Sequence, residues 1–375
     1  MALALIVAHS LGALSSLHAI MSTRTSQGAI AWATSLNLLP FVAVPAYWIF
    51  GRNEFQGYVV SRRSEDAQVS DLRNNVVGRI QPFVVDSAEI SPAARAAQRL
   101  AQVPLLKGND VTLLVDGNET FDDIVAGIDG AQDYVLFQFF IVKDDGLGRR
   151  MKDRLVAKAR DGVRVYFLYD EVGSHALPRA YLNDLRDAGV HVSAFNTRRG
   201  PGNRFQINFR NHRKVVVVDG RSAWIGGHNV GDEYLGLDPN FGRWRDTHVR
   251  VDGPAAMGAQ VSFLEDWNWA TDAVPELNWE PVASSSGEAR VLIAPTGPAD
   301  DVESAGLMFV HAINSATERI WIASPYFVPD QAIISALQLA GLRGVDVRIL
   351  IPDQADHLMV YLAAFTYFDE ASRTG

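Results

Sequence analysis

Cysteine is absent from the 375 residues of this chain, and its absence excludes disulfide bonds, thiolate metal sites and a cysteine nucleophile. Basic residues are a minority, because 34 Lys and Arg stand against 43 Asp and Glu and leave a net charge of −9. Proteins that bind nucleic acid nonspecifically normally present a basic face to the phosphates, so we expect no nucleic-acid partner. With 48% hydrophobic residues, the chain is long enough to bury two sizeable cores.

Charged residues are missing altogether from two stretches near the N-terminus. Residues 1–21 contain no Asp, Glu, Lys or Arg and are just long enough to cross a bilayer as a helix. The alternative, a signal peptide, would normally begin with a basic segment. Residues 28–50 are also uncharged, with Trp32 near one end and Tyr47 and Trp48 near the other, where an aromatic belt would lie. We predict a two-helix transmembrane hairpin over residues 1–50, with a buried core helix as the alternative for its second half.

Prolines and arginines refine the predicted hairpin. Pro40 and Pro45 would break a helix in water, but membrane helices tolerate proline when neighbouring groups satisfy the freed carbonyls. The loop between the two stretches carries only Arg24, whereas three arginines follow the second stretch, namely Arg52, Arg62 and Arg63. Because positive flanks tend to remain in the cytoplasm, we expect both termini and the rest of the chain to face the cytoplasm.

The rest of the chain divides into three segments. Residues 51–108 form a connector that includes an alanine-rich helix at 91–102 with Ser91 at its N-cap. Residues 109–280 and 281–375 alternate short apolar strands with helices, which is typical of α/β layers with a mixed sheet. Strands are predicted at 111–115, 134–142, 163–169, 191–195 and 246–251, a hairpin at 214–225, and helices at 121–128, 148–159 and 178–188.

The C-terminal part repeats the order of elements in the first lobe. Helix, strand, helix and strand follow one another both in residues 121–170 and in residues 307–353. Two such copies, packed about a pseudo-twofold axis, can bring equivalent loops to one shared site. The serine-rich run 284–287 is the natural linker between them.

Polar residues precede and follow an apolar strand in residues 211–229, NHRKVVVVDGRSAWIGGHN. His212 and Lys214 are two positions apart, so their side chains should point to the same face. Four valines follow, as suits a strand buried on both faces, and Asp219 and Gly220 end that strand in a turn. The two polar side chains should therefore meet at one end of a buried strand.

A second short strand then leads to Gly226, Gly227 and Asn229. The glycines permit a ligand to approach the backbone closely, and the asparagine supplies an amide. An imidazole, an ammonium and an amide at one point provide a nucleophile, a fixed cation for phosphoryl oxygens and a neutral donor. This set suits attack on a phosphodiester and requires no metal and no other cofactor.

The spacing His-x-Lys, four residues, Asp, six residues, Gly-Gly-x-Asn resembles the signature of the phospholipase D superfamily. The N-terminal apolar stretches and the phrases QFFIVKDDGLG, NHRKVVVVDG and WRDTHVRVDGP are most similar to the bacterial cardiolipin synthases of that superfamily. The resemblance implies an α/β fold of phospholipase-D-like lobes behind a membrane hairpin in the bacterial inner membrane. It also implies phosphatidyl transfer between two phosphatidylglycerol molecules, with release of glycerol and a phosphatidyl-histidine intermediate.

The resemblance assigns roles to individual residues. His212 would be the nucleophile, Lys214 and Asn229 would bind the nonbridging oxygens, and Gly227 would allow close approach of the phosphate. Asp219 belongs to the signature, but at a strand end it is better suited to holding the turn than to touching substrate.

Related enzymes place an acidic residue on a strand after the motif, and Asp246 is the candidate here. It would accept a hydrogen bond from the other ring nitrogen of His212 and so fix the tautomer. The alternative is a surface aspartate paired with Arg243 or Arg245, and Glu233 is a competing candidate.

Three further groups of residues need an interpretation. The acid-free run 191–218 contains Arg198, Arg199, Arg204, Arg210, Arg213 and Lys214. It is either a positive approach for anionic phospholipid headgroups or a solvated loop. His228 and His248 lack the carboxylate cluster and spacing of a metal site, and Trp244, Trp267 and Trp269 are assigned to packing.

The repeat also predicts a second His-x-Lys segment about 20 residues beyond Gly375, where the sequence stops. Between Gly344 and Gly375 there is only His357, which no lysine follows at the required spacing. We therefore expect the isolated chain to need a second histidine, which a homodimer sharing two copies of His212 would supply. The alternatives are a hydrolytic phospholipase D, in which water replaces the alcohol, and an inactive truncated fragment.

Overall fold

The computed structural model describes residues 2–23, 25–51, 67–195, 210–297, 300, 302–353 and 358–374. Contacts divide the chain into two compact units. The first consists of Met1–Phe83 and Lys107–Ala289, and the second of Val84–Leu106 and Arg290–Gly375. Part of the predicted connector, including the helix that Ser91 caps, therefore belongs to the second unit.

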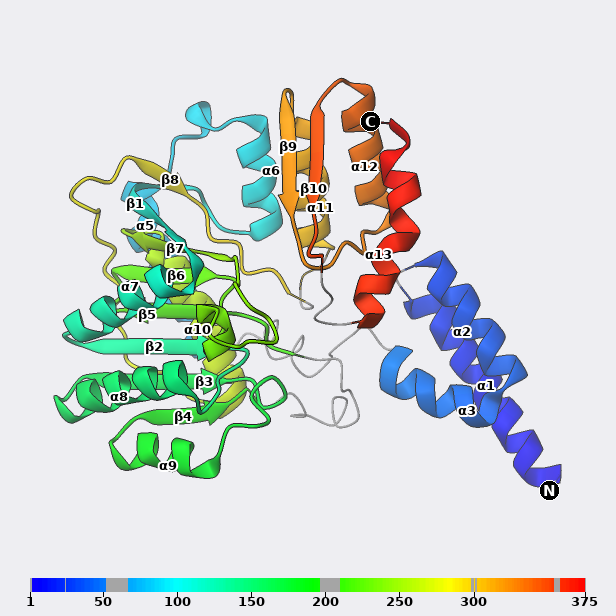
Figure 1. Ribbon diagram of the computed structural model, residues 1–375, viewed down its shortest axis with the longest axis horizontal. Helices are drawn as coiled ribbons and strands as arrows, with labels where there is room; N and C mark the ends of the chain where they lie inside the picture. Colours follow the sequence, from blue (N-terminus) through cyan, green and yellow to red (C-terminus); the bar gives the residue numbers. More distant parts are fainter. Residues whose placement is uncertain are drawn as a thin grey trace. The chain divides into compact units, whose positions relative to one another are not determined.

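Seven strands of the first unit form one sheet in the order β4-β3-β2-β5-β6-β7-β1 (Figure 1). The strands are β1 (Leu106–Val115), β2 (Tyr134–Phe139), β3 (Arg164–Tyr169), β4 (His191–Ala194), β5 (Val215–Val218), β6 (Ser222–Gly226) and β7 (Thr247–Asp252). An eighth strand, β8 (Ala289–Val291), pairs with β1 at the point where the chain passes to the second unit. Strands β2, β3 and β4 pair in parallel, whereas β2–β5, β5–β6, β6–β7 and β7–β1 pair antiparallel. The predicted mixed sheet and the hairpin around residue 220 are confirmed.

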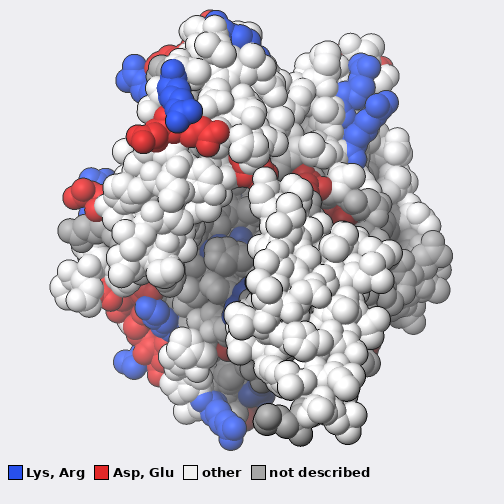
Figure 2. All heavy atoms as spheres, turned by 90° about the vertical axis from the view of Figure 1, so that its right-hand side faces the viewer, with Lys and Arg blue, Asp and Glu red and all other residues white. Residues whose placement is uncertain are grey.

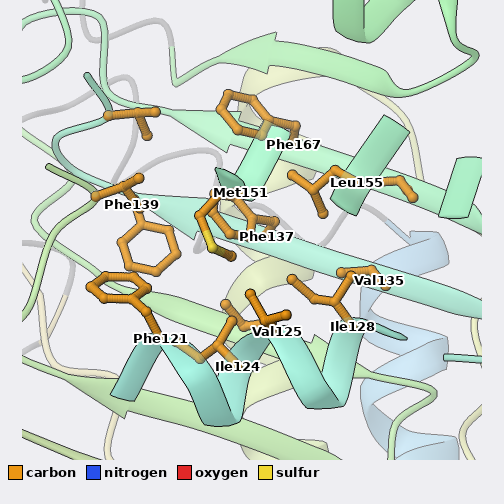
Figure 3. Packing of buried hydrophobic residues seen from close by; sticks show 14 of the residues in the cluster. Phe121, Ile124, Val125, Ile128, Val135, Phe137, Phe139, Met151, Leu155 and Phe167 are labelled. Carbon is orange, nitrogen blue, oxygen red and sulfur yellow. The ribbon is translucent and has the colours of Figure 1, made fainter. Parts of the chain in front are cut away.

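Helices cover both faces of this sheet. They are α7 (Asp116–Gly130), α8 (Gly146–Arg160), α9 (Arg179–Asp187) and α10 (Ala256–Thr271). Along β2, Val135, Phe137 and Phe139 face α7 and α8 in the main core, which Figure 3 shows from close by. The alternate residues Tyr134 and Gln138 bond to side chains of α10, which therefore covers the opposite face. Because both faces are covered, the central strands are mostly apolar, with Gln138 of β2 as a buried polar exception.

The main core follows from helical periodicity. Phe121, Ile124 and Ile128 lie on one stripe of α7 and are fully buried. Phe137 of β2 stacks on Phe167 of β3, with ring centroids 5.3 Å apart. These apolar contacts fix the parallel pair β2–β3 under α7 and α8, and with it the strand β5 that carries the polar motif.

The second unit confirms the predicted repeat. Its elements are α6 (Pro92–Ala101), α11 (Ser304–Ser315), β9 (Arg319–Ala323), α12 (Gln331–Leu342), β10 (Asp346–Leu350) and α13 (Leu358–Ala371). Strands β9 and β10 are parallel and joined through α12, just as β2 and β3 are parallel and joined through α8. Ser91 caps α6 by accepting a hydrogen bond from the backbone N–H of Ala94 at 3.2 Å.

Other elements of the described chain are α5 (Ala67–Ile80), η2 (Gln81–Phe83), η3 (Ser87–Glu89), η4 (Asp232–Leu235) and η5 (Ser372–Thr374).

The N-terminal segment corrects one prediction. Among the described residues only α1 (Ala2–Ser22) is long and apolar enough to cross a membrane. The continuous helix predicted at 28–50 is wrong, because the segment consists of α2 (Ser26–Leu38), α3 (Pro40–Ala46) and the π-helix η1 (Tyr47–Gly51). Leu39 leaves helical geometry with φ −131° and ψ 55°, since proline disfavours a helical residue before it and cannot donate a backbone hydrogen bond. The predicted multi-pass arrangement is therefore not supported.

Helix α1 packs on α2 and α3 through a narrow face of small and polar residues. Ala19 lies against Leu36 and Tyr47 in a small buried cluster. Hydrogen bonds across this face join Trp48 Nε1 to Ser15 Oγ at 3.1 Å and Asn37 Nδ2 to Ser16 Oγ at 3.0 Å. The large apolar side chains of α1 are mostly exposed. Helices α1, α2 and α3 contain no Asp, Glu, Lys or Arg, and Figure 2 shows a broad area of surface without charged side chains. The arginines used to predict orientation, Arg24, Arg52, Arg62 and Arg63, lie outside the described residues.

Candidate functional site

His212 and Lys214 lie side by side immediately before β5. The ammonium nitrogen of Lys214 is 3.0 Å from Nδ1 of His212 and donates to the His212 carbonyl oxygen at 2.7 Å. The ring of Phe140 packs against the imidazole, with centroids 4.5 Å apart. The expectation that these two side chains share one face of the strand is confirmed.

The neighbouring residues point the other way. The side chains of Asn211 and Arg213 reach the buried carboxylate of Asp266 on α10, at 2.8 Å and 2.6 Å. Gln138 of β2 donates to the same carboxylate at 2.7 Å and to the side-chain oxygen of Asn211 at 3.0 Å. A buried polar network thus holds the segment that carries His212, on the side opposite the His212–Lys214 contact.

A second carboxylate holds the start of this segment. Asp170, directly after β3, accepts the backbone N–H of Asn211 at 2.8 Å and those of Val172 and Gly173 at 2.9 Å. Burial raises the pKa of Asp170, while these three hydrogen bonds lower it. The residue before His212 is therefore tied to the end of a central strand.

Burial changes the protonation of both motif residues. It lowers the pKa of Lys214 to about 7, against the raising effect of Asp246. His212 keeps an exposed face, but desolvation of its ring and then the nearby Lys214 lower its pKa to about 4. The imidazole is therefore neutral near pH 7, as a nucleophile must be.

The glycine pair makes room for side chains of the adjacent β7 region. A Cβ on Gly227 would lie 2.1 Å from an oxygen of Asp246, and a Cβ on Gly226 would lie 2.4 Å from the ring of His248. Gly226 and His248 are also direct cross-strand partners. The close approach predicted for a ligand is thus occupied here by a carboxylate and an imidazole of the protein itself.

Asp246 lies over Gly227 and acts on Lys214 through charge. Its carboxylate accepts the backbone N–H of Thr247 at 2.7 Å and the indole N–H of Trp244 at 3.4 Å. Within the described part of the chain, no hydrogen bond joins Asp246 to His212, whose Nδ1 is bonded to Lys214 instead. The predicted direct contact with the imidazole is replaced by an electrostatic one with the lysine.

Neither the structural alternative for Asp246 nor the competing residue Glu233 fits the observed ion pairs. Arg243 and Arg245 pair with Asp116, at 3.1 Å and 3.6 Å, and not with the Asp246 carboxylate. Glu233 is buried and forms an ion pair with Lys143 at 2.6 Å. The surface pairing of Asp246 with these arginines is therefore not observed, and the competing carboxylate of Glu233 is already engaged by Lys143.

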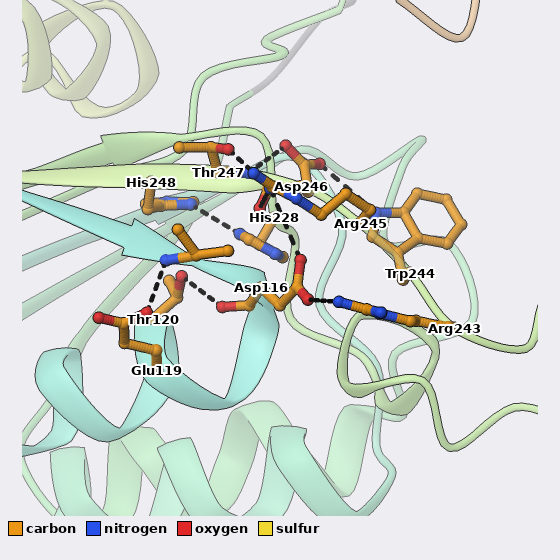
Figure 4. Close-up of polar contacts among 11 residues, drawn as sticks. Asp116, Glu119, Thr120, His228, Arg243, Trp244, Arg245, Asp246, Thr247 and His248 are labelled. Atoms are coloured by element: carbon orange, nitrogen blue, oxygen red, sulfur yellow. Dashed lines mark hydrogen bonds and ion pairs between the residues drawn. The ribbon is translucent and has the colours of Figure 1, made fainter. Parts of the chain in front are cut away.

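His228 and His248 form a buried pair behind Asp246. Their Nδ1 atoms are 3.1 Å apart, so one ring donates and the other accepts (Figure 4). Burial, and to a smaller extent the nearby His228 and Lys214, lower the pKa of His248 to about 3. Burial also lowers the pKa of His228, against the raising effects of Asp246 and Asp116. Among the described residues neither Nε2 has a hydrogen-bond partner, so the pair is a neutral, enclosed unit.

Asn229 and Asp219 serve the backbone. Asn229 accepts the N–H of Ile141 at 3.0 Å and donates to the hydroxyl of Tyr234 at 2.8 Å, which leaves one amide hydrogen for another acceptor. Asp219, at the opposite end of β5 from His212, accepts three backbone N–H groups of residues 132–134. It also has a positive φ of 52°, so its place is in the turn.

The remaining candidates are structural or lie outside the described residues. Trp267 and Trp269 are buried on α10, and Trp244 packs against Tyr234 and Phe241, in agreement with their assignment to packing. Arg198, Arg199, Arg204 and His357 fall outside the described ranges. Within those ranges no group of three His, Cys, Asp or Glu residues could hold a metal ion.

We predict that Gly227→Ala displaces the Asp246 carboxylate, because the added methyl group has no space beside it. The free energy of unfolding should fall by about 1–3 kcal/mol, as in other overpacked sites, which chemical denaturation would measure. Gly130→Ala is the matched control, since its Cβ would meet no atom within 4 Å. Equal stability of the two variants would contradict the assigned packing role.

Comparison with known proteins finds relatives along nearly the whole chain. The family described as "Cardiolipin synthase, PLD-like domain" matches residues 124–254 and 309–375. Cardiolipin synthase A of Pseudomonas putida strain W619 is 49% identical over 372 residues, which cover 98% of this chain and 77% of that protein. Cardiolipin synthase A of Pseudomonas fluorescens strain SBW25 is 48% identical over the same shares. Among solved structures, phosphatidylserine synthase of Haemophilus influenzae matches with a TM-score of 0.48 and 15% identity, over 70% of this chain and 66% of that chain.

Proposed function

This chain belongs to the cardiolipin synthase family of phospholipase-D-like proteins, and we propose that it joins two phosphatidylglycerol molecules to give cardiolipin and glycerol. The observation that carries the proposal is the contact between His212 and Lys214 at the start of β5, in a chain 49% identical to a cardiolipin synthase A. A neutral imidazole beside a cation is the pair that attack on an anionic phosphodiester requires.

The proposed reaction has two displacements at one phosphorus atom. First, a ring nitrogen of His212 attacks the phosphate of one phosphatidylglycerol, the bond to the glycerol headgroup breaks, and the departing oxygen takes up a proton. The primary hydroxyl of a second phosphatidylglycerol then attacks the phosphatidyl-histidine. The phosphorus–nitrogen bond breaks and the hydroxyl proton is released, which restores the enzyme.

Lys214 has to change partner for this reaction. While its ammonium donates to Nδ1 of His212, the neutral imidazole must carry its hydrogen on Nε2, which then has no lone pair for attack. A bound phosphate offers Lys214 stronger, charged acceptors. We infer that phosphate draws the lysine from Nδ1, so that Nδ1 can take the proton and Nε2 becomes the nucleophile.

The other motif residues support this exchange. Asp246 keeps Lys214 cationic, because its charge opposes the effect of burial on the lysine pKa. The free amide hydrogen of Asn229 would donate to a nonbridging oxygen. Gly227 would serve the site by admitting the carboxylate of Asp246, and Asp219 by holding the turn at the far end of β5.

Protonation of the departing glycerol requires a general acid. The buried pair is unsuited to this role, because both rings are enclosed and burial lowers the pKa of His248 to about 3. We propose that a histidine outside this site supplies the proton, as the second copy of His212 in a homodimer would.

We also propose that α1 attaches the protein to the bacterial inner membrane. It has no charged residue and exposes most of its large apolar side chains. Arg24, Arg52 and Arg62 follow it, so the positive-inside rule favours a cytoplasmic catalytic unit. The membrane position would bring the site to its anionic phospholipid substrates.

The first functional prediction concerns the nucleophile. Membranes that contain the protein and radiolabelled phosphatidylglycerol should form cardiolipin, and the protein should acquire acid-labile label. His212→Asn keeps the size of the side chain but removes the attacking nitrogen, so both signals should disappear.

The products separate the competing functions. Phosphatidic acid in place of cardiolipin would indicate a hydrolytic phospholipase D, and the absence of any product would favour an inactive chain. Undiminished labelling of the His212→Asn variant would show that a different residue is the nucleophile.

The pKa of Lys214 predicts an alkaline limit to activity. Burial lowers that pKa to about 7, so the ammonium form is lost as pH rises through this value. Log(kcat/KM) should therefore fall by about one unit per pH unit above it, because kcat/KM reports groups of the free enzyme. His212, with a pKa of about 4, stays neutral throughout that range.

Lys214→Arg is the matched variant, since a guanidinium keeps its positive charge throughout this pH range. Any activity that remains should lose the alkaline limit in a pH profile of cardiolipin formation. The same limit in this variant would assign it to another group and refute the role given to Lys214.

The membrane proposal is testable because the chain has no cysteine. Ser285→Cys should resist a membrane-impermeant thiol reagent in intact cells and react after permeabilisation. Ala2→Cys, before α1, should react in intact cells if α1 alone crosses the membrane. Labelling of Ser285→Cys in intact cells would overturn the cytoplasmic assignment, and protection at Ala2→Cys would indicate a returning second span.

A further inference from the structure

The residues around His212 alternate between two environments. His212 and Lys214 contact each other on one side of the segment, whereas Asn211 and Arg213 both bond to Asp266 on the other side. Asp266 lies on α10, far along the sequence from the motif. The helix that covers the back of the sheet therefore contacts the two residues that flank the nucleophile.

A single oxygen atom of Asp266 accepts hydrogen bonds from three side chains. Oδ2 of Asp266 accepts from Gln138 at 2.7 Å, from Asn211 at 2.8 Å and from Arg213 at 2.6 Å. Asn211 also accepts from Gln138 at 3.0 Å and from the backbone N–H of Arg213 at 3.1 Å. These bonds orient both the side chain before His212 and the peptide after it.

Burial makes this network rigid and sensitive to change. The side chain of Asp266 is 0% exposed and that of Arg213 17% exposed. In such surroundings a carboxylate is retained only when its donors are in place, and loss of one partner leaves an unpaired polar group. The charges of Asp266 and Arg213 compensate each other, so removal of either has a defined electrostatic consequence.

We propose that Asp266 is a positioning residue for the nucleophile: it fixes Asn211 and Arg213 from behind and so directs the imidazole of His212 toward the phosphorus atom. The proposal rests on the function proposed above. His212 lies outside any helix or strand and has an exposed face, so its direction depends on its neighbours. A displacement of about 1 Å at an attacking group can cost about 100-fold in rate.

The test uses the full-length protein in membranes. Asp266→Asn keeps the shape but removes the charge and leaves Arg213 without its ion pair. We expect the rate of phosphatidyl-histidine formation in a single turnover to fall about 10- to 100-fold, with little change in KM, because Asp266 does not touch substrate. Glu265→Gln, the next residue on α10, is the matched control and should retain the normal rate.

A second measurement does not depend on phospholipid chemistry. The rate at which diethyl pyrocarbonate modifies His212, measured by peptide mass spectrometry, should change in Asp266→Asn and stay unchanged in Glu265→Gln. The exposed His175 serves as internal reference in each sample. If the unsubstituted protein forms no phosphatidyl-histidine, the proposed function fails, while this measurement still decides whether Asp266 positions His212.

Two outcomes would overturn the proposal. One is unchanged His212 modification and an unchanged single-turnover rate in a folded Asp266→Asn protein. The other applies if Asp266→Asn does not fold. In that case Arg213→Gln removes the ion pair from its partly exposed partner. A normal modification rate and a normal single-turnover rate in Arg213→Gln would show that the network does not direct His212. A smaller change of the same sign in Arg213→Gln supports the proposal.

Discussion

The site depends on one geometric constraint, which is that a strand buried on both faces sends alternate side chains to opposite sides. The residues that lead into β5 obey it, since His212 and Lys214 face one another on one side while Asn211 and Arg213 reach Asp266 on the other. Because α10 covers the back of the sheet, the anchoring side is dry and the polar groups there must be paired. The reactive side is thereby left as the place where an imidazole with an exposed face and a buried ammonium meet.

Local pattern was sufficient to predict the strands and helices that build the mixed sheet, the hairpin, the repeated order of elements and the meeting of His212 with Lys214, because each of these is recognised from residues close together in sequence. The role of the glycine pair was not predictable in this way, since the groups that fill the space above Gly226 and Gly227 come from the neighbouring β7 region. Asp266 was missed for the same reason, although a lone Gln138 within an apolar strand signals a buried polar partner. The prediction of a continuous helix at 28–50 was wrong because apolar composition indicates only burial or membrane contact. The backbone geometry is set by Pro40, at which a new helix begins.

The groups around Lys214 determine whether its side chain carries a charge. Asp246 is the anion that favours the ammonium form, and the histidine pair behind it stays neutral because burial and mutual proximity disfavour a second cation. A protonated pair would compete with Lys214 for the field of Asp246 and lower the lysine pKa further. Neutral imidazoles fill this space with polar rings that satisfy each other at Nδ1 and leave the carboxylate to the lysine.

This arrangement explains how a chain with a net charge of −9 could handle an anionic lipid. A broad basic surface would attract any polyanion, whereas a single cation in a desolvated site favours a phosphate that has been brought to it by other means. Membrane attachment through α1 would supply that encounter, so attraction over long distances is unnecessary. Selectivity would then rest on the last few ångströms, where a phosphoryl oxygen would replace Nδ1 of His212 as the acceptor for Lys214 and so favour the form of the imidazole with a lone pair on Nε2.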